Sequence, residues 1–225
     1  MSLLGRQEAI DIWGPQKLEA WLRHTWGSIQ AHMSFEVNVH EWSPHEVQTL
    51  HEADHYRLRS IPVKHRIPCC GLRVEEHSLP WKLNGQKAQD AGLPFHVRQA
   101  LKRGESIGFE GRDLKPELWC TQPRKARSYV YSSDTRPCES LRIAAQGATL
   151  LYHDATFNEA DAERAKSTHH STTTEAARLA RQAEVETLML GHLSLRYKNL
   201  DALREEALRE HPNVVLAKDG LLWRL

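Results

Sequence analysis

The second half of the chain is patterned as short apolar runs that end in polar residues. Three such runs, at residues 129–131, 149–152 and 187–190, are each followed by an aspartate or histidine that can bind a metal or move a proton. Short apolar runs bounded by turns predict buried strands. Because chemistry collects beyond the carboxyl ends of largely parallel strands, these three tips predict one shared site and favour an enzyme.

The rest of the pattern predicts helices and strands around these runs. A capping-box pair, Thr172 and Glu175, opens one predicted helix, and Pro212 stops another. In chain order, the pattern predicts a strand at 9–13, a helix at 16–28, strands at 35–39 and 56–61, and helices at 176–183 and about 200–210. This alternation of strand and helix favours an α/β sheet.

Residues 79–104 interrupt that pattern. They are rich in lysine and arginine, contain proline and glycine, and hold few β-branched residues. We expect an arm that projects from the domain. A solvated helical hairpin would produce the same run of charges, so the charges alone do not assign a function.

Composition restricts the classes to which the chain can belong. Its 225 residues suit one α/β domain with an inserted arm, and its formal net charge of +1 gives no overall attraction to nucleic acid. The four cysteines form no C-x-x-C pair, which favours a reducing cytoplasm. No apolar run approaches the ~20 residues of a membrane span and no leader pattern is present, so we expect no membrane association.

Two metal-binding patterns compete. The first, His51 to His55, has the spacing H-E-x-x-H, which on a helix places two histidines on one face. Pro44 and the alternating run that starts at Tyr56 leave too little room for a helix. We therefore expect this string to form a polar turn between two strands.

The second pattern is distributed over His65, Asp134 and His192, each of which follows an apolar strand. A carboxylate between two imidazoles can bridge two metal ions, since each of its oxygens can bind one. A histidine at a strand end also serves in ordinary hydrogen-bonded packing. The pattern alone leaves both interpretations open.

Longer strings resemble one known family. They are Ile12-Trp13-Gly14-Pro15, Val63-Lys64-His65, Pro123-Arg124-Lys125-Ala126-Arg127, Ser133-Asp134-Thr135-Arg136, His153-Asp154-Ala155-Thr156-Phe157, His170-Ser171-Thr172 and Gly191-His192-Leu193-Ser194-Leu195-Arg196-Tyr197. In this order they resemble ribonuclease Z, a family of tRNA 3′-processing endonucleases. The resemblance implies an α/β fold, the metallo-β-lactamase-type αββα sandwich, with an inserted arm that would correspond to the family's tRNA-binding exosite.

The chain also departs from the family pattern. It contains no H-x-H, whereas the family's H-x-H-x-D-H precedes the string that ends in Gly14-Pro15. We therefore expect an N-terminally incomplete fold that lacks most of the metal ligands and the general base. Ser133 replaces a family glycine, Gly191 replaces a threonine, and Asp154 replaces a glutamate with a carboxylate that reaches one methylene less far.

The resemblance implies a role for each site residue. The implied ligands of two Zn²⁺ ions are His65, Asp134 and His192, with the aspartate bridging. The implied catalytic residues are His170, Asp154 and His153. The implied phosphate- and RNA-binding residues are Arg196, Lys125 and Ser194. In this scheme Asp154 orients His170, which stabilises or protonates the departing 3′ oxygen.

The implied activity is removal of 3′ trailers from precursor tRNA, by attack of a metal-held hydroxide on a phosphodiester. The arm would contact backbone phosphates of the tRNA away from the active site. The resemblance also implies a cytoplasmic homodimer. Because the main metal-ligand motif is absent from this sequence, the alternative is a catalytically inactive remnant or a tRNA-binding module.

Overall fold

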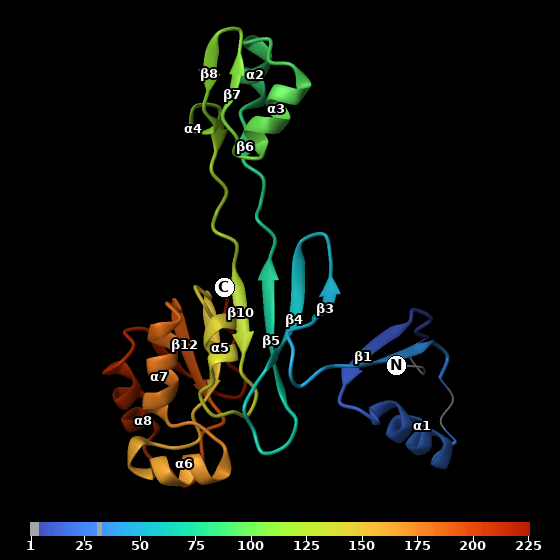
Figure 1. Cartoon of the computed structure of the whole chain (residues 1–225), viewed down its shortest axis with the longest axis vertical. Helices are drawn as coiled ribbons and strands as arrows, with labels where there is room; N and C mark the ends of the chain where they lie inside the picture. The colour runs from blue at the N-terminus through green and yellow to red at the C-terminus, as the bar shows by residue number, and fades with distance from the viewer. Residues whose placement is uncertain (1–4, 31–32) are drawn as a thin grey trace. The chain divides into compact units, whose positions relative to one another are not determined.

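The computed structural model describes residues 5–30 and 33–225, which fall into two compact units. The first unit comprises Met1–Glu75 and Arg127–Leu225, and the second is the insertion Glu76–Ala126. The insertion leaves the first unit after β5 and rejoins it at β10 (Figure 1). Among the described helices, none is long and apolar enough to cross a membrane.

A seven-stranded mixed sheet forms the centre of the first unit (Figure 1). Its strands, in order across the sheet, are β13 (Val214–Leu216), β12 (Thr187–Gly191), β11 (Leu150–Asp154), β10 (Ser128–Tyr131), β5 (Cys70–Glu76), β4 (Tyr56–Pro62) and β3 (Thr49–Glu52). Strands β10 to β13 are parallel, whereas β5 is antiparallel to β10 and β3 is antiparallel to β4. The α/β class is confirmed, and the three apolar runs form three of these four parallel strands, β10, β11 and β12.

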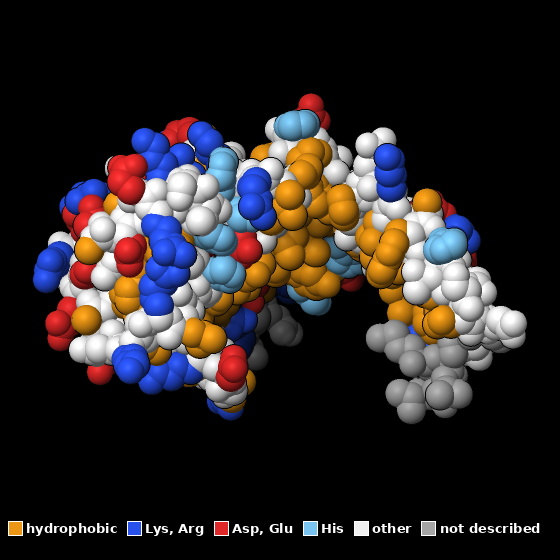
Figure 2. Space-filling view, turned by 90° about the horizontal axis from the view of Figure 1, so that it is seen from below, with side chains coloured by type: hydrophobic (Ala, Val, Ile, Leu, Met, Phe, Trp, Pro, Cys, Tyr) orange, Lys and Arg blue, Asp and Glu red, His pale blue; other side chains and the backbone are white. Residues whose placement is uncertain are grey.

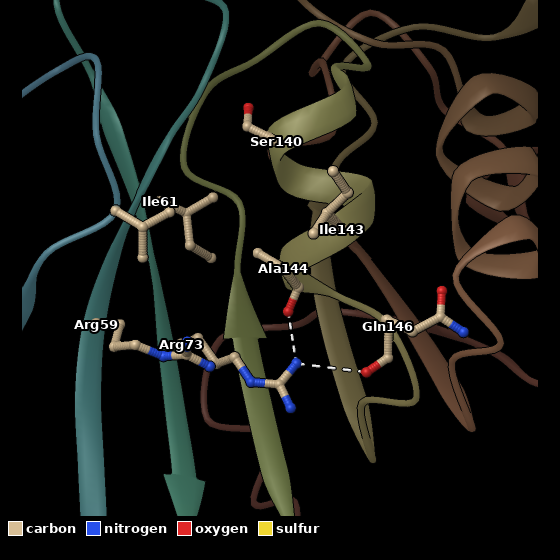
Figure 3. A pocket seen from close by; sticks show the side chains of 8 residues that line it. Arg59, Ile61, Arg73, Ser140, Ile143, Ala144 and Gln146 are labelled. Carbon is tan, nitrogen blue, oxygen red and sulfur yellow. Dashed lines mark hydrogen bonds between the residues drawn. The ribbon is translucent and has the colours of Figure 1, made fainter.

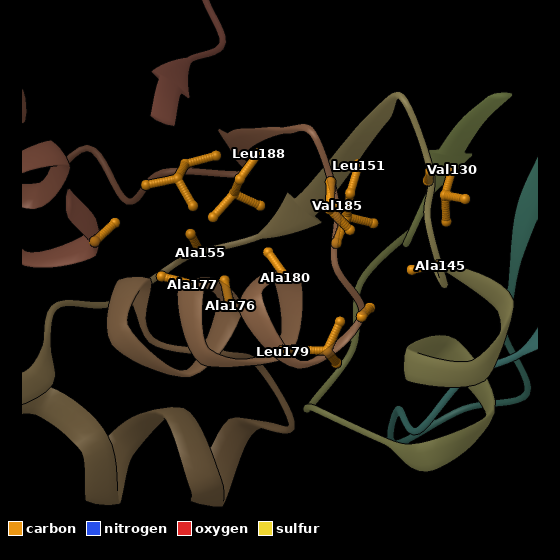
Figure 4. Close-up of a cluster of buried hydrophobic side chains, with 14 of the residues drawn as sticks. Val130, Ala145, Leu151, Ala155, Ala176, Ala177, Leu179, Ala180, Val185 and Leu188 are labelled. Carbon is orange, nitrogen blue, oxygen red and sulfur yellow. The ribbon is translucent and has the colours of Figure 1, made fainter. Parts of the chain in front are cut away.

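The main core lies between the parallel strands and the helices that pack on them (Figure 4). Val130, Leu151 and Leu188 stand in register on three neighbouring strands, and all three are fully buried. Burying a side chain of this size stabilises the fold by about 1.5–3 kcal/mol. The helices of this unit after β10 are α5 (Glu139–Ala144), the 3₁₀ helix η2 (Glu159–Asp161), α6 (Ala162–Thr168), α7 (Thr173–Gln182) and α8 (Leu200–Leu208).

Helix α7 begins with the predicted capping box. The Glu175 backbone donates to the Thr172 hydroxyl at 3.1 Å, and the Thr172 backbone donates to the Glu175 carboxylate at 2.9 Å. Small buried residues on α7, such as Ala176, Ala177 and Ala180, let the helix approach the sheet closely. The cap fixes where α7 starts, and it therefore also places the residues just before the helix.

A separate two-stranded parallel sheet precedes the main one in sequence. It pairs β1 (Ile10–Gly14) with β2 (Val37–Glu41), and α1 (Leu18–Ser28) connects them. The helix starts two residues later than predicted, because Lys17 has a left-handed backbone with φ 74°. The H-E-x-x-H string is not helical. Its first two residues end β3 and its remainder turns into β4, so the predicted turn is shorter than expected.

The insertion folds around a small core of its own. Its strands pair β6 (Lys82–Leu83) with β9 (Cys120–Thr121) and β7 (Ile107–Phe109) with β8 (Arg112–Leu114), and its helices are α2 (Gly85–Asp90), α3 (Phe95–Lys102) and α4 (Pro116–Trp119). The buried core residues are Ala88, Leu93, Val97, Leu101 and Leu114. The arm expected at residues 79–104 lies inside this unit, which continues to residue 126.

Candidate metal and catalytic site

Polar side chains from several segments converge beyond the carboxyl ends of the parallel strands. Asp134 follows β10, Asp154 ends β11 and His192 follows β12, while His170 precedes α7 and His65 follows β4. Possible ligand atoms lie within 4.8 Å of one another in two overlapping groups, one of His65, Asp134 and His170 and one of Asp154, His170 and His192. Figure 2 shows histidine side chains, in pale blue, gathered on one face of the molecule.

Main-chain contacts bring His65 to the strand tips, although β4 lies outside the parallel half of the sheet. The Arg136 backbone donates to the Lys64 carbonyl at 2.9 Å, and the Lys64 backbone donates to the Thr135 hydroxyl at 3.0 Å. These bonds tie the segment after β4 to the segment after β10. His65 follows Lys64 and Asp134 precedes Thr135, so these bonds also place His65 beside Asp134.

The buried Asp154 carboxylate organises the site. It is fully shielded from solvent and accepts four hydrogen bonds. The Thr135 backbone and His170 Nδ1 donate to Oδ2 at 3.0 and 2.7 Å, while the Thr156 backbone and hydroxyl donate to Oδ1 at 3.0 and 2.8 Å. A buried carboxylate is tolerated when its acceptor positions are satisfied in this way. The bond to His170 leaves Nε2 as the free nitrogen of that ring.

Hydrogen bonds also set the tautomers of two further histidines. His65 Nδ1 donates to the backbone carbonyl of His169 at 3.1 Å, because a carbonyl can only accept. The Thr156 hydroxyl gives its single proton to Asp154, so it must accept the 2.7 Å bond from His192 Nδ1. In both rings Nδ1 is therefore the donor in these bonds, and Nε2 is the nitrogen that remains as a possible ligand atom.

This donor set fits a divalent transition metal such as zinc. The ring centroids of His65 and His170 are 5.1 Å apart, those of His170 and His192 are 5.0 Å apart, and Asp134 Oδ1 lies 3.5 Å from His192 Nε2. Imidazole and carboxylate are common zinc ligands, and a ligating histidine usually gives its other N–H to a carbonyl, carboxylate or similar acceptor. Asp154 fits the ligand role less well, because its acceptor positions are already filled.

Left-handed backbone surrounds the site. Ser133 just before Asp134, His169 just before His170, and His192 itself have φ values of 57°, 62° and 57°. For residues with a side chain this conformation costs about 1–2 kcal/mol, and it persists where the surrounding structure enforces it. Strain is therefore stored beside three of the five converging side chains.

Curated proteins named ribonuclease Z are similar to the chain over most of its length. The one from Parabacteroides distasonis is 33% identical over 222 residues, which are 98% of this chain and 73% of that protein. The chain belongs to the ribonuclease Z family. The ribonuclease Z of Porphyromonas gingivalis strain W83 is 36% identical over 92% of this chain and 68% of its own length. Membership places the chain in a family of nucleases, as the sequence strings predict.

Solved structures show the fold. The short form of human tRNase Z matches with a TM-score of 0.61 and 20% identity, over 97% of this chain and 68% of that one. The metallo-β-lactamase fold protein YhfI from Bacillus subtilis matches with a TM-score of 0.58 and 18% identity, over 96% of this chain and 65% of its own. The predicted metallo-β-lactamase fold is confirmed. No family model matches the chain.

The structure places His153, from the ribonuclease Z string at β11, apart from the converging side chains. Its ring is fully buried, its Nδ1 is hydrogen-bonded to the Asp154 carbonyl at 2.7 Å, and its Nε2 has no partner. Burial lowers the pKa of the His153 imidazole, and the backbone bond and nearby carboxylates only partly oppose this. His153 is therefore a neutral residue inside the fold, next to the carboxylate that orients His170.

Two of the three residues expected to bind phosphate lie near the site. Arg196 donates from Nε to the Ser194 hydroxyl at 3.0 Å, and its guanidinium lies 5.2 Å from the centre of the Phe157 ring. That ring is 6.3 Å from the ring of His170. Lys125 belongs to the insertion, so the described site does not include it.

Three site residues lie in or next to the family strings without a role assigned from sequence. Thr135 and Thr156 supply donors to Asp154, and Ser132 accepts from the Asp154 backbone at 2.9 Å. The only signal was their position within two residues of Asp134 or Asp154. A hydroxyl at such a position predicts little, because it bonds locally in many loops.

A separate cavity of 450 Å³ opens between β4, β5 and α5 (Figure 3). Arg73 crosses it and donates to the backbone carbonyl of Ala144 at 2.5 Å. None of the converging side chains lines it; the lining residues are Val47, Arg59, Ile61, Arg73, Ser140, Ile143, Ala144 and Gln146. This cavity is therefore separate from the candidate site.

Proposed function

We propose that the protein is a zinc-dependent endoribonuclease that removes 3′ trailers from precursor tRNA. The observation that carries this proposal is the convergence of His65, Asp134, His170 and His192 in a member of the ribonuclease Z family, with Nδ1 of each histidine held by a hydrogen bond. The relatives named ribonuclease Z give no support to the alternative of an inactive remnant.

The residues that would hold zinc are His65, Asp134 and His192, with Asp134 between the two imidazoles. Bound zinc would act as a Lewis acid on the phosphodiester and would ease deprotonation of water near neutral pH. Zn²⁺-bound PqqB from Methylobacterium extorquens, another protein of this fold, matches with a TM-score of 0.51 at 14% identity. The shared fold is the support that this protein gives to the choice of zinc.

His170 would supply the proton for the leaving group. Its Nδ1–H is held by Asp154 at 2.7 Å, which directs Nε2 outward and stabilises a positive charge on the ring. As a water oxygen bonds to phosphorus and its proton passes to solvent, the bond from phosphorus to the 3′ oxygen breaks. When it acts as the acid, His170 would carry a proton on Nε2 as well as on Nδ1. It would give the Nε2 proton to the departing oxygen, while Nδ1–H stays bonded to Asp154.

Exposed cations would hold the RNA. Arg196 lies over the Phe157 ring near His170 and donates to Ser194, and both residues would contact phosphate oxygens at the cleavage point. The insertion, with Lys125 near its end, would contact the tRNA backbone elsewhere and act as the exosite. Such contacts carry affinity without reading sequence.

Cleavage of a precursor tRNA by the chain, with zinc present, tests the proposal. We expect release of the 3′ trailer, and we expect His170→Ala to slow the cleavage step by about 10²- to 10⁴-fold, the usual contribution of a positioned acid. His55→Ala is the matched control, because this exposed histidine belongs to the H-E-x-x-H string away from the strand tips. Equal loss in both variants, or no cleavage by the unchanged chain, would contradict the proposal.

Two further expectations remain proposals. The four cysteines are free thiols, as expected of a protein in the reducing cytoplasm. A homodimer is suggested by the family resemblance, and α1, which buries none of its residues and leaves Trp21 61% exposed, is a candidate surface for the second copy. Light scattering should then show a dimer that Trp21→Glu dissociates.

A further inference from the structure

The aromatic ring of Tyr152 occupies the space that a side chain at position 191 would need. A Cβ atom built on Gly191 would lie 1.9 Å from both Cζ and the hydroxyl oxygen of Tyr152, far inside the 3.0 Å that real Cβ contacts respect. In the register of β11 and β12, Tyr152 pairs with Met189, so its long ring reaches diagonally to Gly191. The Tyr152 ring can therefore pack in this position only because residue 191 is a glycine.

This contact lies immediately before a proposed metal ligand. His192 follows Gly191 and has a left-handed backbone, while its side chain is 46% exposed. On the other side, the Gly191 carbonyl accepts from the Ala155 backbone at 3.0 Å. Because exposed left-handed residues keep their conformation only when neighbours enforce it, the two contacts at Gly191 are well placed to hold His192.

The Tyr152 ring is itself held in place. Tyr131 on the neighbouring strand lies against it, with ring centroids 5.1 Å apart and a tilt of 37°. Burial raises the pKa of the Tyr152 phenol, and a hydrogen bond from the His192 backbone partly opposes that rise. The phenol therefore stands between Tyr131 and the peptide that carries His192.

We propose that Tyr152 is a positioning residue for His192. By filling the side-chain space of Gly191, its ring fixes the end of β12 and turns the His192 imidazole toward Asp134. This inference rests on the proposed metal site, to which it assigns the residue that sets the direction of one ligand. Tyr152 itself touches neither metal nor substrate in this scheme.

A double-mutant cycle at positions 152 and 191 tests the proposal in the full chain. The measured quantities are the Zn²⁺ dissociation constant, from calorimetric titration, and the thermal unfolding midpoint. We expect Gly191→Ala to weaken Zn²⁺ binding by about 10- to 100-fold, as changes around metal ligands commonly do. In a Tyr152→Ile background the added methyl has room, so Gly191→Ala should weaken binding little further.

Conservative and control variants separate positioning from general packing. Tyr152→Phe keeps the ring and should keep most of the Zn²⁺ affinity, whereas Tyr152→Ile should lose it. Tyr129→Ile is the matched control, because Tyr129 lies on the same face of the sheet, paired with Leu150, away from Gly191. It should lower the unfolding midpoint and leave Zn²⁺ affinity unchanged.

The backbone amide signal of His192 in the ¹⁵N NMR spectrum gives a readout that needs no metal. We expect it to shift in Tyr152→Ile and in Gly191→Ala, and to stay in place in Tyr129→Ile. An unmoved signal, or an equal effect of Gly191→Ala in both backgrounds, would overturn the positioning role. Failure of the unchanged chain to take up Zn²⁺ would instead overturn the proposed metal site, while the NMR signal would still decide the role of Tyr152.

Discussion

The strand tips and the insertion differ in how far their charged side chains are buried. At the tips, Asp154 is fully buried and every acceptor position is used. In the insertion, charges sit on the surface in pairs such as Arg103 and Glu105, whose side chains are 59% and 53% exposed. Buried charge must be satisfied one bond at a time, whereas exposed charge acts through its sum.

The net charge differs between the two units. The insertion holds nine lysines and arginines against six acidic residues, a net charge of +3, while the whole chain has +1. The positive charge is therefore concentrated in the insertion, where backbone phosphates could meet it. The comparison teaches that replacing a single charged residue should damage the tips severely and the insertion only slightly.

The largest effect is expected from Asp154→Ala. It would leave the Thr135 backbone, the Thr156 backbone and His170 Nδ1 without their buried acceptor, a loss that costs about 3–5 kcal/mol of unfolding free energy. Glu105→Ala in the insertion is the control and should change stability by less than about 0.5 kcal/mol. Urea unfolding of both variants measures the difference, and similar values for the two would remove the contrast.

Deletion of the insertion should separate binding from chemistry. Without residues 77–125, we expect weaker binding of precursor tRNA and a shallower dependence of affinity on salt, since each lost phosphate contact lowers the slope by about 0.7–0.9. Hydrolysis of a small phosphodiester should continue. A salt titration that gives the same tRNA affinity and slope as the full chain would refute the exosite.

A smaller effect concerns pH and His153. Burial holds the pKa of this imidazole below its usual 6.5, so below pH 6.5 the unfolded chain takes up a proton that the folded chain resists. The stability that this neutral histidine contributes is present above pH 6.5 and is lost as pH falls toward the lowered pKa, by at most about 1.4 kcal/mol per pH unit. Unfolding free energies measured from pH 7.5 to 5 should show a steeper fall than in His153→Gln.

The smallest effect should come from relieving backbone strain. Ser133 and His169 are left-handed at φ 57° and 62°, where glycine is favoured. The gain of about 1–2 kcal/mol in the folded state is offset by the greater freedom of glycine in the unfolded chain, so we expect His169→Gly to stabilise by about 0.5 kcal/mol. Ser133→Gly should gain less, because it also loses the 3.1 Å contact with Cys69. A lower melting temperature in His169→Gly would show that the side chain matters more than the strain.

Sequence predicted the parts of the site that follow strand periodicity. Asp134, Asp154 and His192 stand at the ends of apolar runs, and register then brings these ends together. The histidine tautomers could not be predicted from the sequence, because they depend on partners such as the His169 carbonyl, which is distant in sequence from His65. No sequence pattern predicts the direction of a single backbone carbonyl.

Two other features escaped prediction for physical reasons. The insertion was expected as a charged arm, yet its apolar residues at Val97 and Leu101 form a helical face that closes a small core. Gly191, where the family string has threonine, gave no signal by itself. The structure explains this glycine, because the Tyr152 ring fills the space that a threonine side chain would take.

The histidine side-chain ¹⁵N NMR spectrum, recorded with and without Zn²⁺, tests most directly whether the strand tips form one prearranged metal site. We expect His65, His170 and His192 to carry their protons on Nδ1 before metal is added. Added Zn²⁺ should then shift the Nε2 signals of His65 and His192. Protons found on Nε2 instead of Nδ1 in His65 or His192, or zinc-dependent shifts confined to His51 and His55, would contradict the site.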